Sequence, residues 1–186
     1  MPLTAGVQLI MPIYRYVADS DSFACIAPKG PKDRKAIDSL YDDKPKAKKW
    51  TPARVSLDVS QGKLGDFPSL YGGIPVFSER AWEILQPLLL GCVEALPLIL
   101  PTHRKYYAIH VLDVVNALDT EKSVLDYFPN GSVMDIEKIV FKKNAIQNKH
   151  MFKLPEKYSS DVYLSDYFKK TVDGNKLKGI EFDKVA

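Results

Sequence analysis

The sequence predicts an α+β fold, with a largely antiparallel sheet and two or three helices packed against it. Short apolar segments typical of strands occur along the chain, and only two segments show a convincing helical period. The 186 residues are enough to bury an apolar core without disulfides or a structural metal. We therefore expect residues 1–186 to form a single domain.

Strands are predicted near the start of the chain at residues 8–17 and 23–26, which are short and apolar. Apolar and polar side chains then alternate over residues 53–59, with Val55 and Leu57 on the apolar face. This alternation indicates a strand with one buried face.

The clearest predicted helix begins after Ser78, whose side chain can cap a helix N-terminus. The apolar residues that follow recur with a helical period, and polar residues cover the other side. These apolar residues are Ala81, Trp82, Leu85, Leu88 and Leu89. Because Pro87 lacks a backbone N–H, we expect a kink or an early end there, with Gly91 closing the segment.

Residues 106–113 form a predicted strand that is apolar on both faces, which favours a central position in a covered sheet. Residues 129–132 read Pro-Asn-Gly-Ser and predict a hairpin turn, because asparagine and glycine tolerate the positive φ that tight turns need. Further strands are predicted at residues 139–141 and 151–154.

The end of the chain is predicted to form a strand, a helix and a strand. The strands cover residues 162–164 and 180–185, and Ser165 is the expected cap of the helix between them. Strands therefore precede, separate and follow two convincing helices, which is the basis of the predicted fold class.

The clearest shift in composition covers residues 29–49. This segment holds eight cations and four aspartates, whereas the rest of the chain has 18 cations and 19 anions, a formal charge of −1. The eight cations are Lys29, Lys32, Arg34, Lys35, Lys44, Lys46, Lys48 and Lys49. Because Pro28 precedes the segment and Pro31 and Pro45 lie within it, we interpret it as an exposed loop or excursion.

Cysteine content and hydropathy predict a cytoplasmic protein with no membrane partner. Cys25 and Cys92 are too few and too far apart in sequence for a secreted disulfide framework. No basic residues precede the first apolar residues, as they would in a signal peptide. The apolar stretch 88–100 contains Glu94 and Pro97 and is shorter than the roughly 20 residues of a spanning helix.

The residue types used in catalysis do not occur in recognisable patterns. His110 lies in an apolar predicted strand, while His103 and His150 have polar neighbours. No His-Glu-x-x-His or Cys-x-x-Cys spacing indicates a zinc site, and the glycine-lysine pair at 62–63 lacks the following hydroxyl of a P-loop. We therefore predict no catalytic, cofactor-binding or metal-binding residues.

Several longer segments together carry a family resemblance. They are residues 62–68 (GKLGDFP), 75–82 (PVFSERAW), 106–119 (YYAIHVLDVVNALD) with Lys122 and Ser123, 152–156 (FKLPE) and 177–182 (LKGIEF). These segments resemble the immunity MXAN protein family, a bacterial family first catalogued as a domain of unknown function. The resemblance covers about residues 50–186 and leaves the lysine-rich segment outside.

The resemblance implies a small intracellular protein of a polymorphic toxin system that binds and neutralises a cognate toxin without being an enzyme. The resemblance assigns no catalytic residue to this chain. If the toxin is a cationic, phosphate-binding enzyme, Asp119, Glu121 and Asp126 are the expected contacts, because carboxylates can imitate phosphate charge. An acidic toxin would instead favour a second set of residues, namely Lys44, Lys46, Lys48 and Lys49.

Two other functions stay open at the level of sequence. An uncharacterised enzyme could combine dispersed carboxylates with His110. A nucleic-acid accessory protein could act through residues 29–49, with Tyr41 and Trp50 as stacking groups. Nucleic acid is the less favoured partner, because aspartates interrupt the segment and the rest of the chain is not basic.

Overall fold

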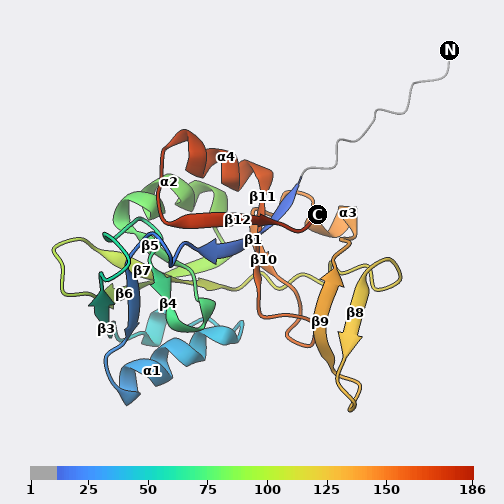
Figure 1. Cartoon of the computed structure of the whole chain (residues 1–186), viewed down its shortest axis with the longest axis horizontal. Coiled ribbons are helices and arrows are strands. Elements are labelled where there is room, and N and C mark those ends of the chain that lie inside the picture. The colour runs from blue at the N-terminus through green and yellow to red at the C-terminus, as the bar shows by residue number, and fades with distance from the viewer. Residues whose placement is uncertain (1–11) are drawn as a thin grey trace.

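The computed structural model describes residues 12–186, which form two β-sheets, a separate hairpin and four α-helices (Figure 1). The smaller sheet is antiparallel, with the strand order β10-β11-β1-β12. Its strands are β1 (Ile13–Ala18), β10 (Met151–Lys153), β11 (Val162–Ser165) and β12 (Ile180–Lys184). Strand β1 therefore lies between two strands from the C-terminal end of the chain.

The larger sheet has the strand order β4-β2-β3-β6-β7-β5. Its strands are β2 (Cys25–Pro28), β3 (Ala53–Asp58), β4 (Ser69–Leu70), β5 (Val76–Ser78), β6 (Val93–Ile99) and β7 (Tyr106–Val111). Two of its pairings are parallel, β2 with β4 and β3 with β6, and the others are antiparallel. The predicted α+β fold with largely antiparallel sheets is confirmed.

Helices α2 (Glu79–Leu89) and α4 (Asp166–Gly174) lie together on one side of the molecule, and α1 (Pro31–Asp38) lies on the opposite side (Figure 1). Helix α3 (Lys143–Ile146) is short. Both predicted caps are confirmed, because Ser78 Oγ accepts the Ala81 N–H at 3.1 Å and Ser165 Oγ accepts the Phe168 N–H at 3.1 Å. None of the helices within residues 12–186 has the length and apolar character needed to span a bilayer.

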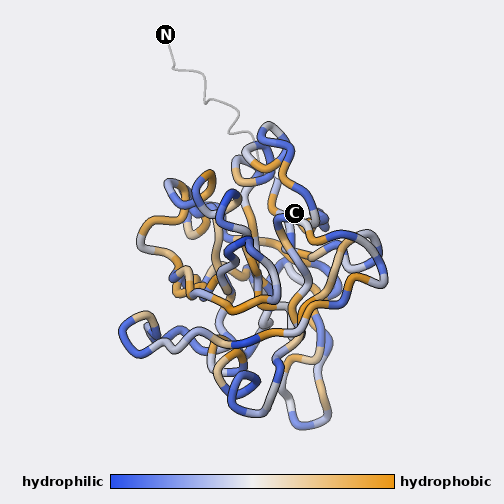
Figure 2. Tube along the Cα trace, turned by 90° about the vertical axis from the view of Figure 1, so that its left-hand side faces the viewer, coloured by the Kyte–Doolittle hydropathy of each residue, from blue (hydrophilic) through white to orange (hydrophobic). Residues whose placement is uncertain are grey.

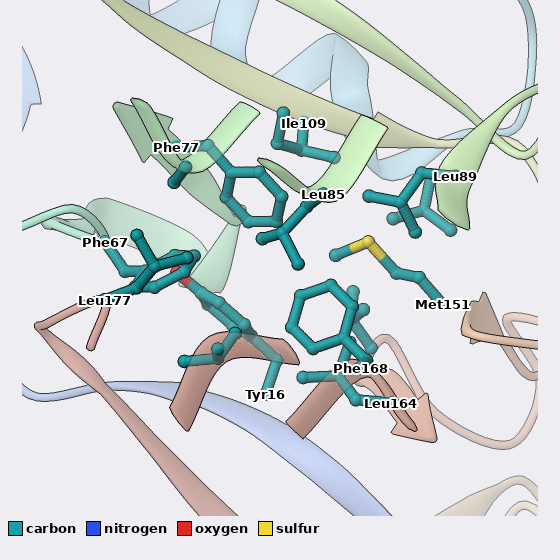
Figure 3. Close-up of a cluster of buried hydrophobic side chains, with 14 residues drawn as sticks. Tyr16, Phe67, Phe77, Leu85, Leu89, Ile109, Met151, Leu164, Phe168 and Leu177 are labelled. Carbon is teal, nitrogen blue, oxygen red and sulfur yellow. The ribbon is translucent and has the colours of Figure 1, made fainter. Parts of the chain in front are cut away.

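The main core receives side chains from both sheets and from helices α2 and α4. In Figure 3, Phe77 and Ile109 of the larger sheet face Tyr16 and Leu164 of the smaller one, with Leu85 of α2 between them. Apolar side chains from distant parts of the sequence are thus removed from water together, which is the main stabilising effect in a fold of this size. The apolar segments run through the interior, and the outer loops are mostly hydrophilic (Figure 2).

Strand β7 is an inner strand, as the predicted central position requires, but it is second from the edge, with β6 on one side and the edge strand β5 on the other. Its side chains alternate between two cores. Ile109 and Val111 enter the main core, whereas Tyr106 and Ala108 enter a second core that also contains Ile37 of α1. This double burial explains why both faces of the strand are apolar.

A third core lies on the other face of the smaller sheet. On β11, Val162 and Leu164 point into the main core, and Tyr163 between them points into the third. Tyr163 packs there with Phe141 and Phe152, at ring-centroid distances of 5.3 and 5.6 Å. Both faces of the smaller sheet are therefore covered.

Residues 29–49 contain helix α1 where the sequence predicts an exposed loop. Their cations lie at the surface, but Ile37 and Leu40 are buried in the second core. Two apolar side chains three residues apart are too few to reveal a helical period within a charged segment. The segment therefore covers one face of the larger sheet while it exposes its lysines.

Other expectations differ in detail. Residues 139–141 do not form the predicted strand, and Phe141 makes only an isolated bridge to Leu118. The apolar stretch 88–100 contains strand β6, which was expected only as core. Helix α2 continues past Pro87. Of the first predicted strand, residues 13–17 belong to β1, and residues 8–11 lie outside the described part.

Candidate partner-binding site

Strands β8 (Val124–Tyr127) and β9 (Val133–Lys138) form a hairpin that projects from the body of the molecule (Figure 1). We call residues 124–138 the arm. Its turn uses the predicted residues, because Asn130 Oδ1 accepts the Ser132 N–H at 3.0 Å. Gly131 has a φ of 82°, which glycine adopts without strain. The predicted hairpin turn is therefore confirmed.

The base of the arm is fixed to the third core. Leu125 and Ile136 are register partners, and both pack against that core. At the same end, the Ser123 hydroxyl donates to the Val140 carbonyl at 3.3 Å and accepts the Val140 N–H at 3.0 Å. The arm is therefore anchored at its base, and its outer part is left accessible.

The arm carries large apolar side chains that are open to solvent, one at its base and three nearer the turn. Val124, Tyr127, Phe128 and Met134 have exposed fractions of 45, 58, 47 and 54%. Single exposed apolar residues are ordinary, but a cluster of four on one hairpin is a feature of interaction sites. Aromatic residues and methionine are also enriched at protein interfaces. These features make the arm a candidate protein-binding surface.

The three predicted contact residues lie on or beside the arm. Asp126 belongs to β8, and Glu121 is exposed just before it. Asp119 lies at the base, where it accepts a 2.7 Å hydrogen bond from Lys122 Nζ. This hydrogen bond holds the pKa of Asp119 below its usual value. The structure thus gathers the three carboxylates at one hairpin, with Asp119 already paired.

Sequence reasoning missed two further carboxylates, Asp135 and Glu137, on strand β9. Asp135 is the register partner of Asp126, and Glu137 is exposed. Residues 119–138 therefore contain five carboxylates against two lysines. The predicted turn at 129–132 could have revealed this cluster, because a hairpin turn fixes which flanking residues face each other.

A cavity of about 340 Å³ opens beside the arm and is lined by Met134, Asp135, Asp161 and Tyr163 among others. Tyr163 is fully buried, and this burial raises its pKa to about 12, so its phenol stays protonated. Arg15 Nη1 lies 3.4 Å from Asp161 Oδ2 at the same cavity. The volume of the cavity lies at the lower end of the range for ligand sites and suits one side chain inserted by a partner.

His110 has a structural environment. It is fully buried, with its Nδ1 atom 3.2 Å from Glu94 Oε2 and its Nε2 atom 2.7 Å from the Asp42 carbonyl oxygen. The ring therefore does meet a carboxylate, as the enzyme alternative requires, but it exposes no surface to a substrate. Its two hydrogen bonds hold the loop at residue 42 against strands β6 and β7.

Within residues 12–186, no group of three or more His, Cys, Asp or Glu side chains is arranged to hold a metal ion. The cysteines Cys25 and Cys92 are both free. Of the four lysines expected to contact an acidic toxin, Lys46 forms a 2.7 Å ion pair with Asp42.

Three of the family-like segments meet at one buried carboxylate. Asp66 Oδ1 accepts the Ser78 hydroxyl at 2.8 Å, and Asp66 Oδ2 accepts the Lys178 N–H at 3.0 Å and Arg80 Nη1 at 3.2 Å. Gly65 allows this approach, because a Cβ atom there would lie 2.9 Å from the Lys178 carbonyl oxygen. Segments 62–68, 75–82 and 177–182 thus form one structural unit.

The fold and the site define an α+β protein that presents an acidic, aromatic hairpin to its surroundings. The sequence comparison gives the family. Residues 41–186 match the sequence model of the immunity protein family (Imm11), so the chain belongs to that family. This match confirms the resemblance drawn from the individual segments. No curated protein matches the chain.

Proposed function

We propose that this protein is a non-enzymatic immunity protein that binds a cognate toxin of a polymorphic toxin system through the arm. Bound in this way, it would block the active site of the toxin or the access of its substrate. Membership of the immunity family supports the general role. The observation that carries the binding surface is that one hairpin exposes Val124, Tyr127, Phe128 and Met134 together with several carboxylates. Aromatic anchors within a polar rim are typical of binding hot spots.

The charge of the arm favours a toxin with a cationic surface, such as a nuclease. Glu121, Asp126 and Asp135 would face it, while Asp119 supports the base through Lys122. Complementary charge accelerates encounter and selects among partners. The lysines at 44, 46, 48 and 49 are the alternative surface for an acidic toxin. We place the protein in the cytoplasm, where the free thiols of Cys25 and Cys92 would stay reduced.

The test is co-expression with a candidate toxin from the neighbouring genes, with growth and direct complex formation as readouts. The test variant combines Tyr127→Ser with Phe128→Ser. Its control is Tyr167→Ser, which alters an equally open tyrosine, 52% exposed, on helix α4. We expect the double variant to lose protection and to bind at least about thirtyfold more weakly. We expect the control to protect like the parent.

Two results would count against the proposal. If the parent protein neither rescues growth nor binds an active toxin, the immunity function is wrong for that pair. If the parent protects and the double variant protects equally well, the immunity role stands and the arm is not the binding surface.

A further inference from the structure

A groove of about 720 Å³ lies between helix α1 and residues 45–54. Its volume falls within the range of ligand-binding sites. Part of its lining is apolar and comes from Ala36, Pro45, Trp50, Pro52 and Ile99. The side chain of Ile99 is 52% exposed, so apolar surface is open to an incoming ligand.

The charged lining of the groove is strongly basic. It consists of Lys32, Lys35, Lys46, Lys49 and Arg54, against one carboxylate, Asp33. That carboxylate is buried and already engaged, because Asp33 Oδ1 accepts the Arg54 N–H at 2.9 Å. Asp33 Oδ2 lies 3.7 Å from Arg54 Nε. Asp33 therefore neutralises Arg54 and leaves the lysines unbalanced.

Within the described part of the chain, three of the lysines have no counter-charge. Lys46 is paired with Asp42, but no carboxylate within residues 12–186 forms an ion pair with Lys32, Lys35 or Lys49. Like charges held at one groove repel each other, and an anionic ligand would relieve that repulsion. The groove thus combines apolar contact area with uncompensated positive charge.

The wall opposite α1 is held in place by hydrogen bonds. The Trp50 indole N–H donates to the Pro97 carbonyl at 2.9 Å. The Glu94 carboxylate accepts the backbone N–H groups of Lys46 at 2.7 Å and Ala47 at 3.1 Å. A groove that is already ordered loses less conformational entropy when it binds a ligand.

We propose that this basic groove binds an acidic peptide segment of a protein partner, with an apolar side chain of the peptide against Ile99 and its carboxylates at Lys32, Lys35 and Lys49. The site is separate from the arm and does not depend on the arm's role. Helix α1 precedes residue 41, where the family match begins. The proposal therefore concerns this chain and not the whole family.

A peptide suits the groove better than a nucleic acid does. A nucleic-acid strand carries a charge at every nucleotide and needs a positive track that continues along its length. Outside residues 29–49, the chain has a formal charge of −1, which argues against such a track. The ring of Trp50 is also half-buried and fixed by its hydrogen bond, which limits its use as a stacking platform.

The probe is a short fluorescent peptide in which glutamates surround a leucine-phenylalanine pair, titrated into the full chain at low salt. A neutral analogue of this peptide has glutamine in place of every glutamate. A single-stranded oligonucleotide tests whether the groove binds nucleic acid instead. The groove variant combines Lys32→Glu, Lys35→Glu and Lys49→Glu. The matched control combines Lys63→Glu, Lys143→Glu and Lys184→Glu, which are exposed lysines outside the groove. Circular dichroism verifies that both variants are folded.

We expect the acidic peptide to bind, the neutral analogue to bind at least about tenfold more weakly, and the groove variant to lose binding while the control retains it. The proposal is overturned if the parent does not bind the peptide, or if groove and control variants lose binding equally. Tighter binding of the oligonucleotide, with displacement of the peptide, would assign the groove to nucleic acid. A concentration-dependent dimer that the groove variant lacks would assign it to a second copy of this chain.

Discussion

Asp126 and Asp135 are register partners on the two strands of the arm, so two carboxylates occupy one rung of the hairpin. Like charges directly opposite each other destabilise an antiparallel pair by a few tenths to about 1 kcal/mol. The free protein therefore carries a charge arrangement that a cationic partner would relieve. The concentrated negative charge of the arm therefore lowers the stability of the free protein by a small amount.

The substitution Asp135→Asn tests this relationship. Asparagine keeps an oxygen that can accept the Ile136 N–H, which Asp135 Oδ1 accepts at 2.8 Å. We expect the free energy of unfolding, measured in urea, to rise by about 0.2–1 kcal/mol, and toxin binding at low salt to weaken. A variant that is less stable than the parent, or that binds the toxin as tightly, contradicts this account.

The substitution Asp66→Ala should damage the fold. It removes the acceptor for Ser78, Arg80 and Lys178 and leaves a buried hydroxyl and a backbone N–H without their partner. We expect a loss of about 1.5–3 kcal/mol in the free energy of unfolding. Asp21→Ala, at an exposed turn residue, is the control and should change stability by less than about 0.5 kcal/mol. Equal effects of the two substitutions would show that Asp66 is not a structural centre.

Glu94 should make stability depend on pH. Burial works to raise the pKa of Glu94, but hydrogen bonds from Lys46, Ala47 and His110 outweigh it, and the pKa lies below its usual value. As pH falls, the unfolded chain therefore takes up a proton at this site first. The stabilisation is fully present above about pH 5 and is lost as pH falls through the folded-state pKa.

We therefore expect Glu94→Gln to be less stable than the parent at pH 7, with a difference that shrinks toward pH 3. Hydrogen exchange provides a second measurement. The amides of Lys46 and Ala47 should exchange faster in the variant, because their acceptor loses its charge. A stability difference that stays constant with pH would disprove the assignment.

His150 should destabilise the protein on mild acidification. Burial lowers the pKa of His150, and its Nδ1 atom lies 2.9 Å from Ser165 Oγ, the cap of helix α4. A cation there would face the positive end of the helix dipole. Because the unfolded chain binds the proton more readily, stability falls as pH drops below about 6.5 toward the folded-state pKa.

The measurement compares unfolding of the parent and His150→Gln between pH 5 and 7.5. Carboxylates that titrate at the lower end of this range contribute equally to both chains, so the difference isolates the histidine. The parent should lose stability more steeply than the variant. Parallel curves would show that His150 titrates alike in the folded and unfolded states.

Local features were predictable from the sequence wherever neighbouring residues decide the structure. The caps Ser78 and Ser165 and the turn at 129–132 each rest on hydrogen bonds within three residues along the chain. The burial of both faces of β7 was predictable because apolar and polar residues do not alternate in its sequence. Helix α1 was not predictable, because the larger sheet supplies the partners that bury Ile37 and Leu40.

The candidate site was predictable only where its residues are neighbours in the sequence. Asp119, Glu121 and Asp126 lie close together in sequence, so their grouping needed no knowledge of the fold. The role of Asp135 depends on strand register, and the basic groove depends on the approach of α1 to residues 45–54. The pairing of His110 with Glu94 likewise arises from the registered strands β6 and β7.

Strand β1 determines where this protein can be shortened. Among the strands of residues 12–186, β1 is the only neighbour of β12 and separates β12 from β11, and β2 is the only neighbour of β4. Both β1 and β2 precede residue 41, where the family match begins. A fragment trimmed to residues 41–186 would lose an inner strand from each sheet and open both toward aggregation through unpaired edges. The limits of sequence similarity therefore differ from the limits of the folding unit.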